Sequence, residues 1–306
     1  EIFDIYQDRE GYLWIGTTNG LARDDGFRLQ PFRSDYKNLN LLTNNSISNI
    51  VDNSRYVWIG TWKGLNLYDK QTCKIIPFPD TRLLDKGINY MAADKEDNIW
   101  IGAGNTIYRC NSTASIVKEY DIFGSQQNRH AINFVYQDRE GNMWALTGGG
   151  LFRYDEKADS FVTYPPLGKN NAPYTMCQDQ SGNYWIGTWG EGLWQFFPKK
   201  EGEECYKRHH IINSRSGETE PIFYSMTQDN TFGYLWLLSY NELYALQYTE
   251  EGTLVPVDIH DLVDTHMMYT KIMKDREGNL WLGSYDMAYT IFFDNSKIDN
   301  YPLPQL

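Results

Sequence analysis

The amino-acid sequence predicts an all-β fold, a seven-bladed β-propeller of four-stranded antiparallel blades. Three observations predict it: a Trp that recurs at near-even intervals, a polar turn before each of these Trp residues, and short stretches of alternating apolar and polar residues. The recurring residues are Trp14, Trp58, Trp100, Trp144, Trp185, Trp236 and Trp281, spaced 44, 42, 44, 41, 51 and 45 residues apart. Four strands in a repeat of this length are typical of propellers, whereas the repeats of a β-solenoid, the alternative, are normally much shorter.

Each repeat reads as four short strands, and the second repeat shows them in order. Residues 47–51 alternate, a polar turn follows, and the strands 58–61, 64–69 and 74–78 come after it. No stretch of the chain shows convincing helical periodicity. We therefore expect a single propeller domain over residues 1–306, with repeats at about 2–33, 46–79, 88–120, 131–164, 173–211, 222–259 and 268–301.

The turn residues and the Trp of each repeat read as scaffold. In the first repeat the turn runs from Asp8 to Gly11. Gly supplies a positive φ, Asp accepts hydrogen bonds from the turn amides, and the Trp ring is expected to pack between adjacent blades. Seven equivalent copies favour this structural role over a catalytic or calcium-binding one, and the spacing of an EF-hand loop is missing. We expect no metal site and no cofactor.

The composition argues against several functional classes. The chain has 28 Lys and Arg against 40 Asp and Glu, a net charge of −12, so we expect no binding to nucleic acid, whose phosphates such a surface repels. No apolar run approaches the roughly 18 residues that span a bilayer, so we expect no membrane contact by this region. The sequence opens inside a repeat and shows no signal peptide, which indicates a fragment of a longer protein. The four Cys lack metal-type spacing and are expected to be isolated, buried thiols.

The pattern Asp-x-x-Gly-Asn-Leu-Trp-Ile-Gly-Thr-x-x-Gly-Leu-x-x-Tyr-Asp, best seen at 179–193 and 52–69, resembles the two-component regulator propeller repeat. The resemblance covers residues 2 to about 301. It implies the amino-terminal sensor propeller of a hybrid two-component system, in the periplasmic part of an inner-membrane receptor. In that family a second propeller, an immunoglobulin-like domain, a membrane helix, a histidine kinase, a receiver and a DNA-binding domain follow. The resemblance thus implies a neighbouring propeller and a receptor homodimer as partners, and kinase activity only outside this region.

Three repeats depart from the family pattern. The third, at 102–107, and the seventh, at 285–288, lose the Gly-Leu pair, and the sixth carries one extra residue in its first turn, at 230–233. These departures leave open whether every blade contributes equally to a binding face.

Propeller topology places the loop between the second and third strands on the same face as the inter-blade connections. The fourth residue after each blade Trp falls in these loops: Thr18, Trp62, Gly104, Gly148, Trp189, Tyr240 and Tyr285. Aromatic rings flanked by polar groups suit a sugar, whose C–H face stacks while its hydroxyls need partners. The predicted ligand-binding residues are therefore Trp62, Trp189, Tyr240 and Tyr285, with Lys63 and Asn241 beside them. The alternative is that these rings only pack the repeat.

The inter-blade connections on this face are long, at 34–45, 121–129 and 212–221. Long loops on a rigid scaffold commonly carry binding residues. We predict that Arg129 and Arg215 pair with the carboxylate or sulfate of an acidic sugar, since Arg binds such groups in a bidentate manner. The alternative is a solvated surface charge at each.

Catalytic patterns are missing from the sequence. The five His show no H-x-H or H-E-x-x-H spacing, and no G-x-S-x-G motif occurs. His209 and His210 are expected on the surface of an outer strand. Three functions remain: a sensor of oligosaccharides from polysaccharide breakdown that regulates their utilisation genes, a scaffold that packs against its neighbouring propeller or a second chain, and a glycan-cleaving propeller enzyme.

Overall fold

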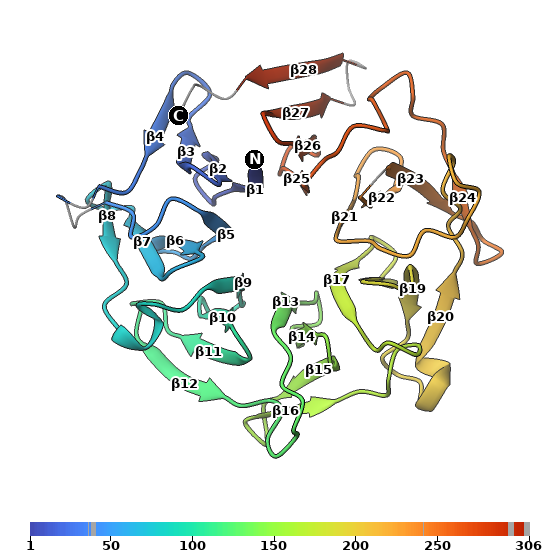
Figure 1. Ribbon diagram of the computed structural model, residues 1–306, viewed down its shortest axis with the longest axis horizontal. Coiled ribbons are helices and arrows are strands. Elements are labelled where there is room, and N and C mark those ends of the chain that lie inside the picture. The colour runs from blue at the N-terminus through green and yellow to red at the C-terminus, as the bar shows by residue number, and fades with distance from the viewer. Residues whose placement is uncertain (36, 38–40, 241, 293–296, 303–306) are drawn as a thin grey trace. The chain divides into compact units, whose positions relative to one another are not determined.

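The computed structural model describes residues 1–306 except 36, 38–40, 241, 293–296 and 303–306. Within these residues the strands form seven four-stranded antiparallel sheets, so the fold is the predicted seven-bladed β-propeller (Figure 1). We number the sheets as blades 1–7 in chain order. The chain divides into two compact units, of which the first covers Glu1–Thr163, with blades 1–4, and the second begins at Tyr164 and holds blades 5–7.

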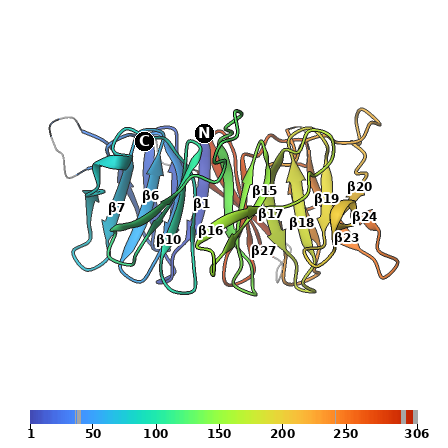
Figure 2. The ribbon, with the colours of Figure 1, turned by 90° about the horizontal axis from the view of Figure 1, so that it is seen from below.

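Blades 1–4 pair their strands in chain order, and the strands run between two sets of loops (Figure 2). The strands are β1 (Ile2–Gln7), β2 (Leu13–Thr17), β3 (Gly20–Asp24), β4 (Leu29–Phe32), β5 (Ile47–Asp52), β6 (Tyr56–Thr61), β7 (Leu65–Asp69), β8 (Lys74–Pro77), β9 (Ile88–Ala93), β10 (Ile99–Ala103), β11 (Thr106–Cys110), β12 (Ile116–Tyr120), β13 (Ile132–Gln137), β14 (Met143–Thr147), β15 (Gly150–Asp155) and β16 (Ser160–Thr163). A short 3-10 helix, η1 (Thr81–Leu83), lies in the connection between β8 and β9.

Blades 5–7 repeat this arrangement in the second unit. Their strands are β17 (Pro173–Gln178), β18 (Tyr184–Thr188), β19 (Leu193–Phe196), β20 (Tyr206–His209), β21 (Ser225–Gln228), β22 (Leu235–Leu238), β23 (Leu243–Tyr248), β24 (Leu254–Pro256), β25 (Lys271–Lys274), β26 (Leu280–Gly283), β27 (Met287–Phe292) and β28 (Lys297–Pro302). A second 3-10 helix, η2 (Gly202–Cys205), precedes β20. No helix of the described residues is long and apolar enough to cross a membrane.

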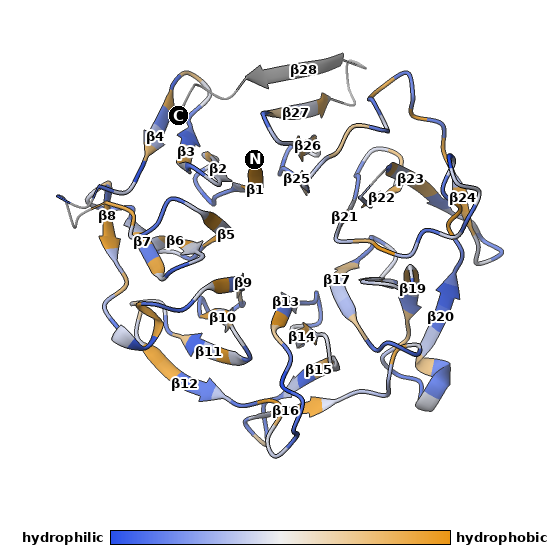
Figure 3. Cartoon of the chain, viewed as in Figure 1, coloured by the Kyte–Doolittle hydropathy of each residue, from blue (hydrophilic) through white to orange (hydrophobic). Residues whose placement is uncertain are grey.

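The hydrophobic core lies between adjacent blades, while most connecting loops are hydrophilic (Figure 3). The Trp14 ring of blade 1 packs 5.0 Å from the Tyr68 ring of blade 2. In the second unit, the Trp185 ring of blade 5 lies 5.1 Å from the Tyr248 ring of blade 6. The expectation that the blade Trp packs between blades is therefore confirmed at these positions.

A Gly in the second strand allows neighbouring blades to approach closely. A Cβ added at Gly16 would lie 2.5 Å from Cγ2 of Ile47, the first residue of β5 in blade 2. The same addition at Gly102 would lie 2.6 Å from Cγ2 of Ile132, the first residue of β13 in blade 4. The Gly of the Trp-Ile-Gly-Thr segment is thus required by inter-blade packing.

The Asp of each first turn fixes the turn and the blade Trp together. In blade 4, Asp138 Oδ1 accepts a hydrogen bond from the Asn142 amide at 2.8 Å, and its Oδ2 accepts one from Trp144 Nε1 at 2.9 Å. The indole bond recurs at 2.7–2.9 Å in six blades, from Trp14, Trp100, Trp144, Trp185, Trp236 and Trp281 to Asp8, Asp94, Asp138, Asp179, Asp229 and Asp275. The predicted scaffold role of the turn Asp is confirmed in these six blades. The Asp also binds the indole N–H of the blade Trp, which was not predicted.

Blade 2 departs from this rule because its first turn is one residue shorter. Asn53, not the predicted Asp52, accepts the turn amides, from Arg55 at 3.1 Å and Tyr56 at 2.9 Å. A carboxamide has only one acceptor oxygen, so none is left for the indole. Trp58 Nε1 is buried and has no hydrogen-bond partner among the described residues.

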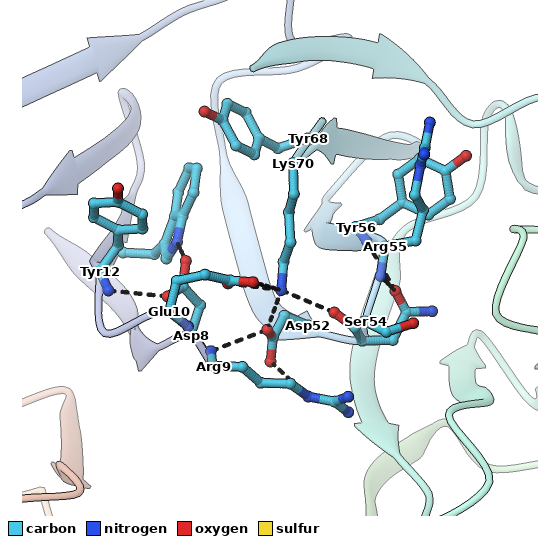
Figure 4. A network of polar contacts seen from close by, with 12 residues as sticks. Asp8, Arg9, Glu10, Tyr12, Asp52, Ser54, Arg55, Tyr56, Tyr68 and Lys70 are labelled. Atoms are coloured by element: carbon cyan, nitrogen blue, oxygen red, sulfur yellow. Dashed lines mark hydrogen bonds and ion pairs between the residues drawn. The ribbon is translucent and has the colours of Figure 1, made fainter. Parts of the chain in front are cut away.

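Asp52 instead joins blades 1 and 2 (Figure 4). Its buried carboxylate accepts hydrogen bonds from the Tyr6 hydroxyl at 2.7 Å, the Arg9 amide at 3.0 Å and Lys70 Nζ at 2.6 Å. Burial and the neighbouring Asp52 charge raise the pKa of Tyr6 far above its ordinary value, so this hydroxyl stays a donor.

The cysteines and His209 differ in part from expectation. All four Cys are free, and Cys110 and Cys205 are buried, but Cys73 is exposed. His209 lies on the outer strand β20, yet it is only 7% exposed because Trp185 and blade 6 cover it. Its Nε2 lies 3.2 Å from Gln195 Oε1, and burial, helped by the nearby Lys207 and His210, lowers the pKa of His209 to about 4.

We predict that Trp144→Phe destabilises the fold by about 2 kcal/mol more than Trp58→Phe. Both rings are 0% exposed, so the packing losses are similar, but only Trp144 loses a bond to a carboxylate, and such bonds contribute roughly 1.5–3 kcal/mol. Urea unfolding of the two variants measures the difference. Equal losses would contradict the assigned role of the indole bond.

We predict that His209 weakens the fold in mild acid. The unfolded imidazole titrates near 6.5 and the folded one near 4, so the unfolded state binds the extra proton and stability falls as the pH drops from 6.5 toward 4. The loss is about 2–3 kcal/mol between pH 7 and pH 4.5, since one pKa unit corresponds to about 1.4 kcal/mol. In His209→Gln the difference in unfolding free energy between these pH values shrinks by that amount. The exposed neighbour supplies the control: His210 makes only the smallest contribution to the lowered pKa of His209, so His210→Gln should keep most of the wild-type pH dependence.

Candidate functional site

The loops between second and third strands lie beside the inter-blade connections. In the first unit the Trp62 amide donates to the Ser46 carbonyl at 3.0 Å, where Ser46 ends the connection into blade 2. In the second unit the Trp189 amide donates to the Ala172 carbonyl at 3.1 Å, and the Gly190 amide to the Pro221 carbonyl at 2.9 Å. Each of these loops therefore shares one face of its unit with the connections. We call it the loop face.

Four aromatic side chains of blades 5 and 6 form a continuous row on the loop face of the second unit. The Trp189 ring lies 5.0 Å from Tyr174 and 5.3 Å from Tyr240, and Tyr240 lies 5.7 Å from Tyr224. Trp189 is 41% and Tyr240 is 42% exposed, whereas Tyr174 and Tyr224 are half-buried behind them. We call Tyr174, Trp189, Tyr240 and Tyr224 the aromatic row. The structure thus brings together two of the predicted ligand-binding residues.

The two supporting Tyr residues were not predicted. Tyr174 is the bulged residue of β17, because Pro173 pairs with Thr188 and Thr175 with Gly187. A β-bulge turns the side chain of its extra residue away from the regular alternation. The bulge recurs in β1, β5, β9 and β13, where Phe3, Ser48, Asn89 and Asn133 are the bulged residues. Tyr174 lies eleven residues before its blade Trp, as Phe3 does, so aligning the repeats could have found it.

Hydrogen bonds hold the row in place. The Tyr224 hydroxyl donates to the Ser239 carbonyl at 3.0 Å and to the Tyr269 carbonyl. Burial raises the pKa of Tyr174, so its hydroxyl is protonated at neutral pH. The row is therefore a preformed surface with an apolar body and protonated hydroxyl groups.

Arg215 lies at the tip of a small hairpin next to the row. The hairpin, residues 211–220, is closed by the Ile212–Thr219 bridge, and Arg215 is exposed. Two buried carboxylates hold its base to blade 6. Glu242 accepts bonds from the Ser214 amide at 3.1 Å and the Ser214 hydroxyl at 2.5 Å. Glu220 accepts one from the Tyr244 hydroxyl at 3.1 Å.

The residue eight positions after a blade Trp commonly fastens the connection that precedes its blade. Asn66 accepts a bond from the Thr43 amide at 3.0 Å, and Tyr244 donates to Glu220. The equivalent contacts of blades 3, 4 and 7 are Lys86 with Tyr108, Phe123 with Phe152 and Tyr269 with Tyr289. Each of these five connections is thus held at one structurally equivalent position, by an Asn, a Phe or a Tyr side chain.

The remaining predicted residues are spread over the loop faces. Tyr285 is 52% exposed, and no ring contact of it is present among the described residues. Trp62 is 59% exposed and meets Phe3 at 6.0 Å. Lys63 Nζ lies 3.5 Å from Asp85 Oδ1.

Arg129 and Asn241 complete the set of predicted ligand-binding residues. Arg129 is engaged within its own connection, donating to Asp121 at 2.5 Å and to the Gly124 carbonyl at 3.0 Å. Its guanidinium is therefore partly occupied before any ligand arrives. Asn241 lies outside the described residues.

The described part of the chain holds no group of three or more His, Cys, Asp or Glu side chains arranged for a metal ion. Glu220 and Glu242, two buried carboxylates beside the row, accept their hydrogen bonds from Asn213, Tyr244 and Ser214. They fasten a connection, and sequence reasoning missed them because nothing in the repeat distinguishes them from surface Glu.

The chain is a β-propeller built from repeats, and known proteins resemble it both in its repeats and in its fold. Residues 1–19 and 167–190 match the family model of the two component regulator propeller. The resemblance seen in the sequence is therefore confirmed over these two segments. None of the curated proteins matches the chain.

Solved structures share the fold. A streptogramin B lyase aligns with a TM-score of 0.69 and 15% identity over 92% of this chain and 90% of that one. The extracellular domain of a putative hybrid two component system from B. thetaiotaomicron aligns with a TM-score of 0.59 and 21% identity over 100% of this chain and 44% of that one. PorZ, a surface component of the type-IX secretion system of Porphyromonas gingivalis, aligns with a TM-score of 0.67 and 15% identity over 95% of this chain and 46% of that one. The chain spans less than half of the last two, and identities this low establish only the fold.

We predict that Glu242→Gln loosens the 211–220 hairpin locally. The carboxylate accepts two bonds from Ser214, and a neutral amide weakens both because charge-assisted bonds are about twice as strong. Hydrogen exchange of peptides covering this hairpin should speed up about tenfold, the equivalent of about 1.4 kcal/mol. Glu218→Gln, in the exposed part of the same hairpin, should leave exchange unchanged. Equal effects of both substitutions would remove Glu242 as the fastener.

Proposed function

We propose that this chain is the sensor module of a hybrid two-component signalling receptor and that it binds an oligosaccharide on the aromatic row. The observation that carries the proposal is the row itself, in which two exposed rings on the loop face are supported from behind by two Tyr side chains. The two component regulator propeller repeats support the receptor context.

The chemistry of the row fits a sugar. A pyranose offers an apolar C–H face to an aromatic ring and a rim of hydroxyls that need hydrogen-bond partners. Trp189 and Tyr240 supply the rings, and the Tyr174 and Tyr240 hydroxyls lie within the same row. The ring planes of Trp189 and Tyr240 meet at 83°, so the two rings form a corner. A corner suits one sugar unit held on two sides better than an extended chain of units lying flat on the surface.

Arg215 extends this proposal toward acidic sugars. Arg215 projects from the hairpin that Glu242 holds through Ser214. Glu242 lies two residues after Tyr240 in the sequence. A guanidinium at that place suits a carboxylate or sulfate on the sugar. In the first unit Trp62, Lys63 and Arg129 stay proposed ligand residues of that unit's own loop face, and Tyr285 stays one in the second unit.

In this proposal the module lies in the periplasm, as the extracytoplasmic part of an inner-membrane receptor. Sugar binding would shift the arrangement of two paired receptor chains and so control genes for use of that sugar. The neighbouring propeller and the second receptor chain are the proposed protein partners.

Packing without a ligand is the second candidate function. Exposed aromatic residues are also enriched at protein interfaces, and Trp62, 59% exposed beside Phe3, fits a partner surface equally well. We propose no catalysis for this region. The likeness to a lyase concerns the fold alone, and the buried Glu residues near the row already fasten a connection.

We predict that Trp189→Ala and Tyr240→Ala each weaken oligosaccharide binding about tenfold or more, about 1.4 kcal/mol per tenfold change. The measurement is a calorimetric titration, after a thermal-shift screen against neutral and acidic plant and host oligosaccharides. Loss of stacking on either ring removes one side of the corner.

Phe232→Ala is the matched control, because Phe232 is 56% exposed but lies in the β21–β22 turn, at the other end of blade 6 from Tyr240. It should bind like the wild type. No response of the folded wild type to any sugar would reject this row as a self-sufficient site and favour the packing function. Release of reducing sugar during the titration would favour the enzyme.

A further inference from the structure

The connection into blade 7 brings two His side chains together at the surface. The rings of His260 and His266 have their centres 5.9 Å apart, with planes at 61°. Two imidazoles that bind one ion through Nε2, at about 2.1 Å each, have ring centres roughly 5 to 6.5 Å apart. The observed separation falls within this range, so the two rings can reach one ion.

One of the two rings is already oriented as a metal ligand would be. His260 Nδ1 lies 2.8 Å from Asp258 Oδ1, and since a carboxylate only accepts, Nδ1 carries a proton and Nε2 is the nitrogen left to bind an ion. Metal-binding His residues commonly have this carboxylate behind them, which fixes the tautomer and raises the basicity of the other nitrogen. The His260 side chain is 61% exposed, so an ion can reach it.

His266 presents its ring in a complementary way. Its Nδ1 is buried and has no hydrogen-bond partner within the described residues. Because Nδ1 is buried, Nε2 is the nitrogen of this half-buried ring that is left for an ion. Its backbone amide donates to Asp264 Oδ1 at 3.0 Å, which holds the residue in its turn.

The backbone between the two His residues is fixed by the core. Ile259, Val263 and Tyr269 are at most 5% exposed, and the Val263 amide donates to the Ile259 carbonyl at 3.1 Å. Because these anchors flank both His residues, little ordering is needed when an ion binds.

The charge of this segment also favours a cation. Residues 257–270 contain Asp258, Asp261 and Asp264 but no Lys or Arg. Acidic side chains raise the local concentration of cations, while the two imidazoles select the kind of cation. Imidazole nitrogen suits Zn²⁺, Ni²⁺ and Cu²⁺, whereas Mg²⁺ and Ca²⁺ prefer oxygen ligands.

We propose that His260 and His266 form a surface site for a divalent transition-metal ion, with Asp258 as the residue that orients His260. The protein supplies two nitrogen ligands, and water completes the coordination shell. The site adjoins the aromatic row, because the Tyr269 carbonyl accepts the Tyr224 hydroxyl and the Thr265 carbonyl accepts the Leu243 amide. A bound ion therefore joins two positions within the connection between β24 and β25, which supports the row.

The test is a calorimetric titration of the folded chain with Zn²⁺ alone, and again in excess Mg²⁺. We expect one Zn²⁺ per chain that Mg²⁺ does not displace. His260→Gln and His266→Gln should each weaken binding tenfold or more, and Asp258→Asn about tenfold, the usual effect of losing a partner behind a ligand. In NMR spectra, the ring C–H signals of these two His should shift with Zn²⁺ while the others stay.

His210→Gln is the matched control, since His210 is an exposed His outside this connection. It should bind Zn²⁺ like the wild type, and thermal melts without metal should show that every variant is folded. Unchanged affinity in His260→Gln and His266→Gln, or displacement of Zn²⁺ by Mg²⁺, would overturn the proposal. Because no sugar is used, its outcome is independent of the proposed sensing function.

Discussion

The hydrogen bond from the blade Trp to the Asp of the first turn is the constraint on which the blades depend. One carboxylate holds the turn amides with one oxygen and the indole with the other, so the turn and the second strand cannot move independently. The indole ring in turn packs on an aromatic ring of the next blade, as Trp100 does on Tyr154 at 4.8 Å. Turn, blade and inter-blade packing are thereby fixed by one pair of residues, and bonds of this charged kind are strong when buried.

Much of the fold could be predicted because this pair and its spacing are visible in the sequence. The Trp intervals, the turn residues and the period-2 strands follow directly from local rules. The different roles of Asn53 and Asp52 in blade 2 could not be predicted. Because the first turn is one residue shorter, Asn53 takes the structural position of the turn Asp, and Asp52 contacts blade 1 only in the folded chain. His209 was expected at the surface for a similar reason. Its strand is an outer one, but residues of the next blade bury it, and strand position alone says nothing of them.

The loop residues of the candidate site could be predicted from the sequence, whereas the Tyr residues packed behind them could not. Counting four residues from the blade Trp found Trp189 and Tyr240, because a tight hairpin keeps that count constant. Tyr174 escaped because a β-bulge breaks the alternation from which side-chain direction is inferred. The charged residues were least predictable: Arg129 is engaged by Asp121 of its own connection, a pairing that depends on how that connection folds.

The two ends of a blade differ in how much they vary: the first-turn end is nearly constant, and the end that carries the inter-blade connections varies from blade to blade. At the turn end, six blades use the same Asp and Trp, so that end tolerates little change. At the other end, the connection is fastened by an amide in blade 2, a phenol in blades 3 and 6 and a phenyl ring in blade 4. Because several chemistries do this job at one position, loop-face residues can change without loss of the blade. A surface that varies on a constant scaffold suits the proposed sensing function. It also explains why the aromatic row can be particular to two blades while the repeat remains common to all.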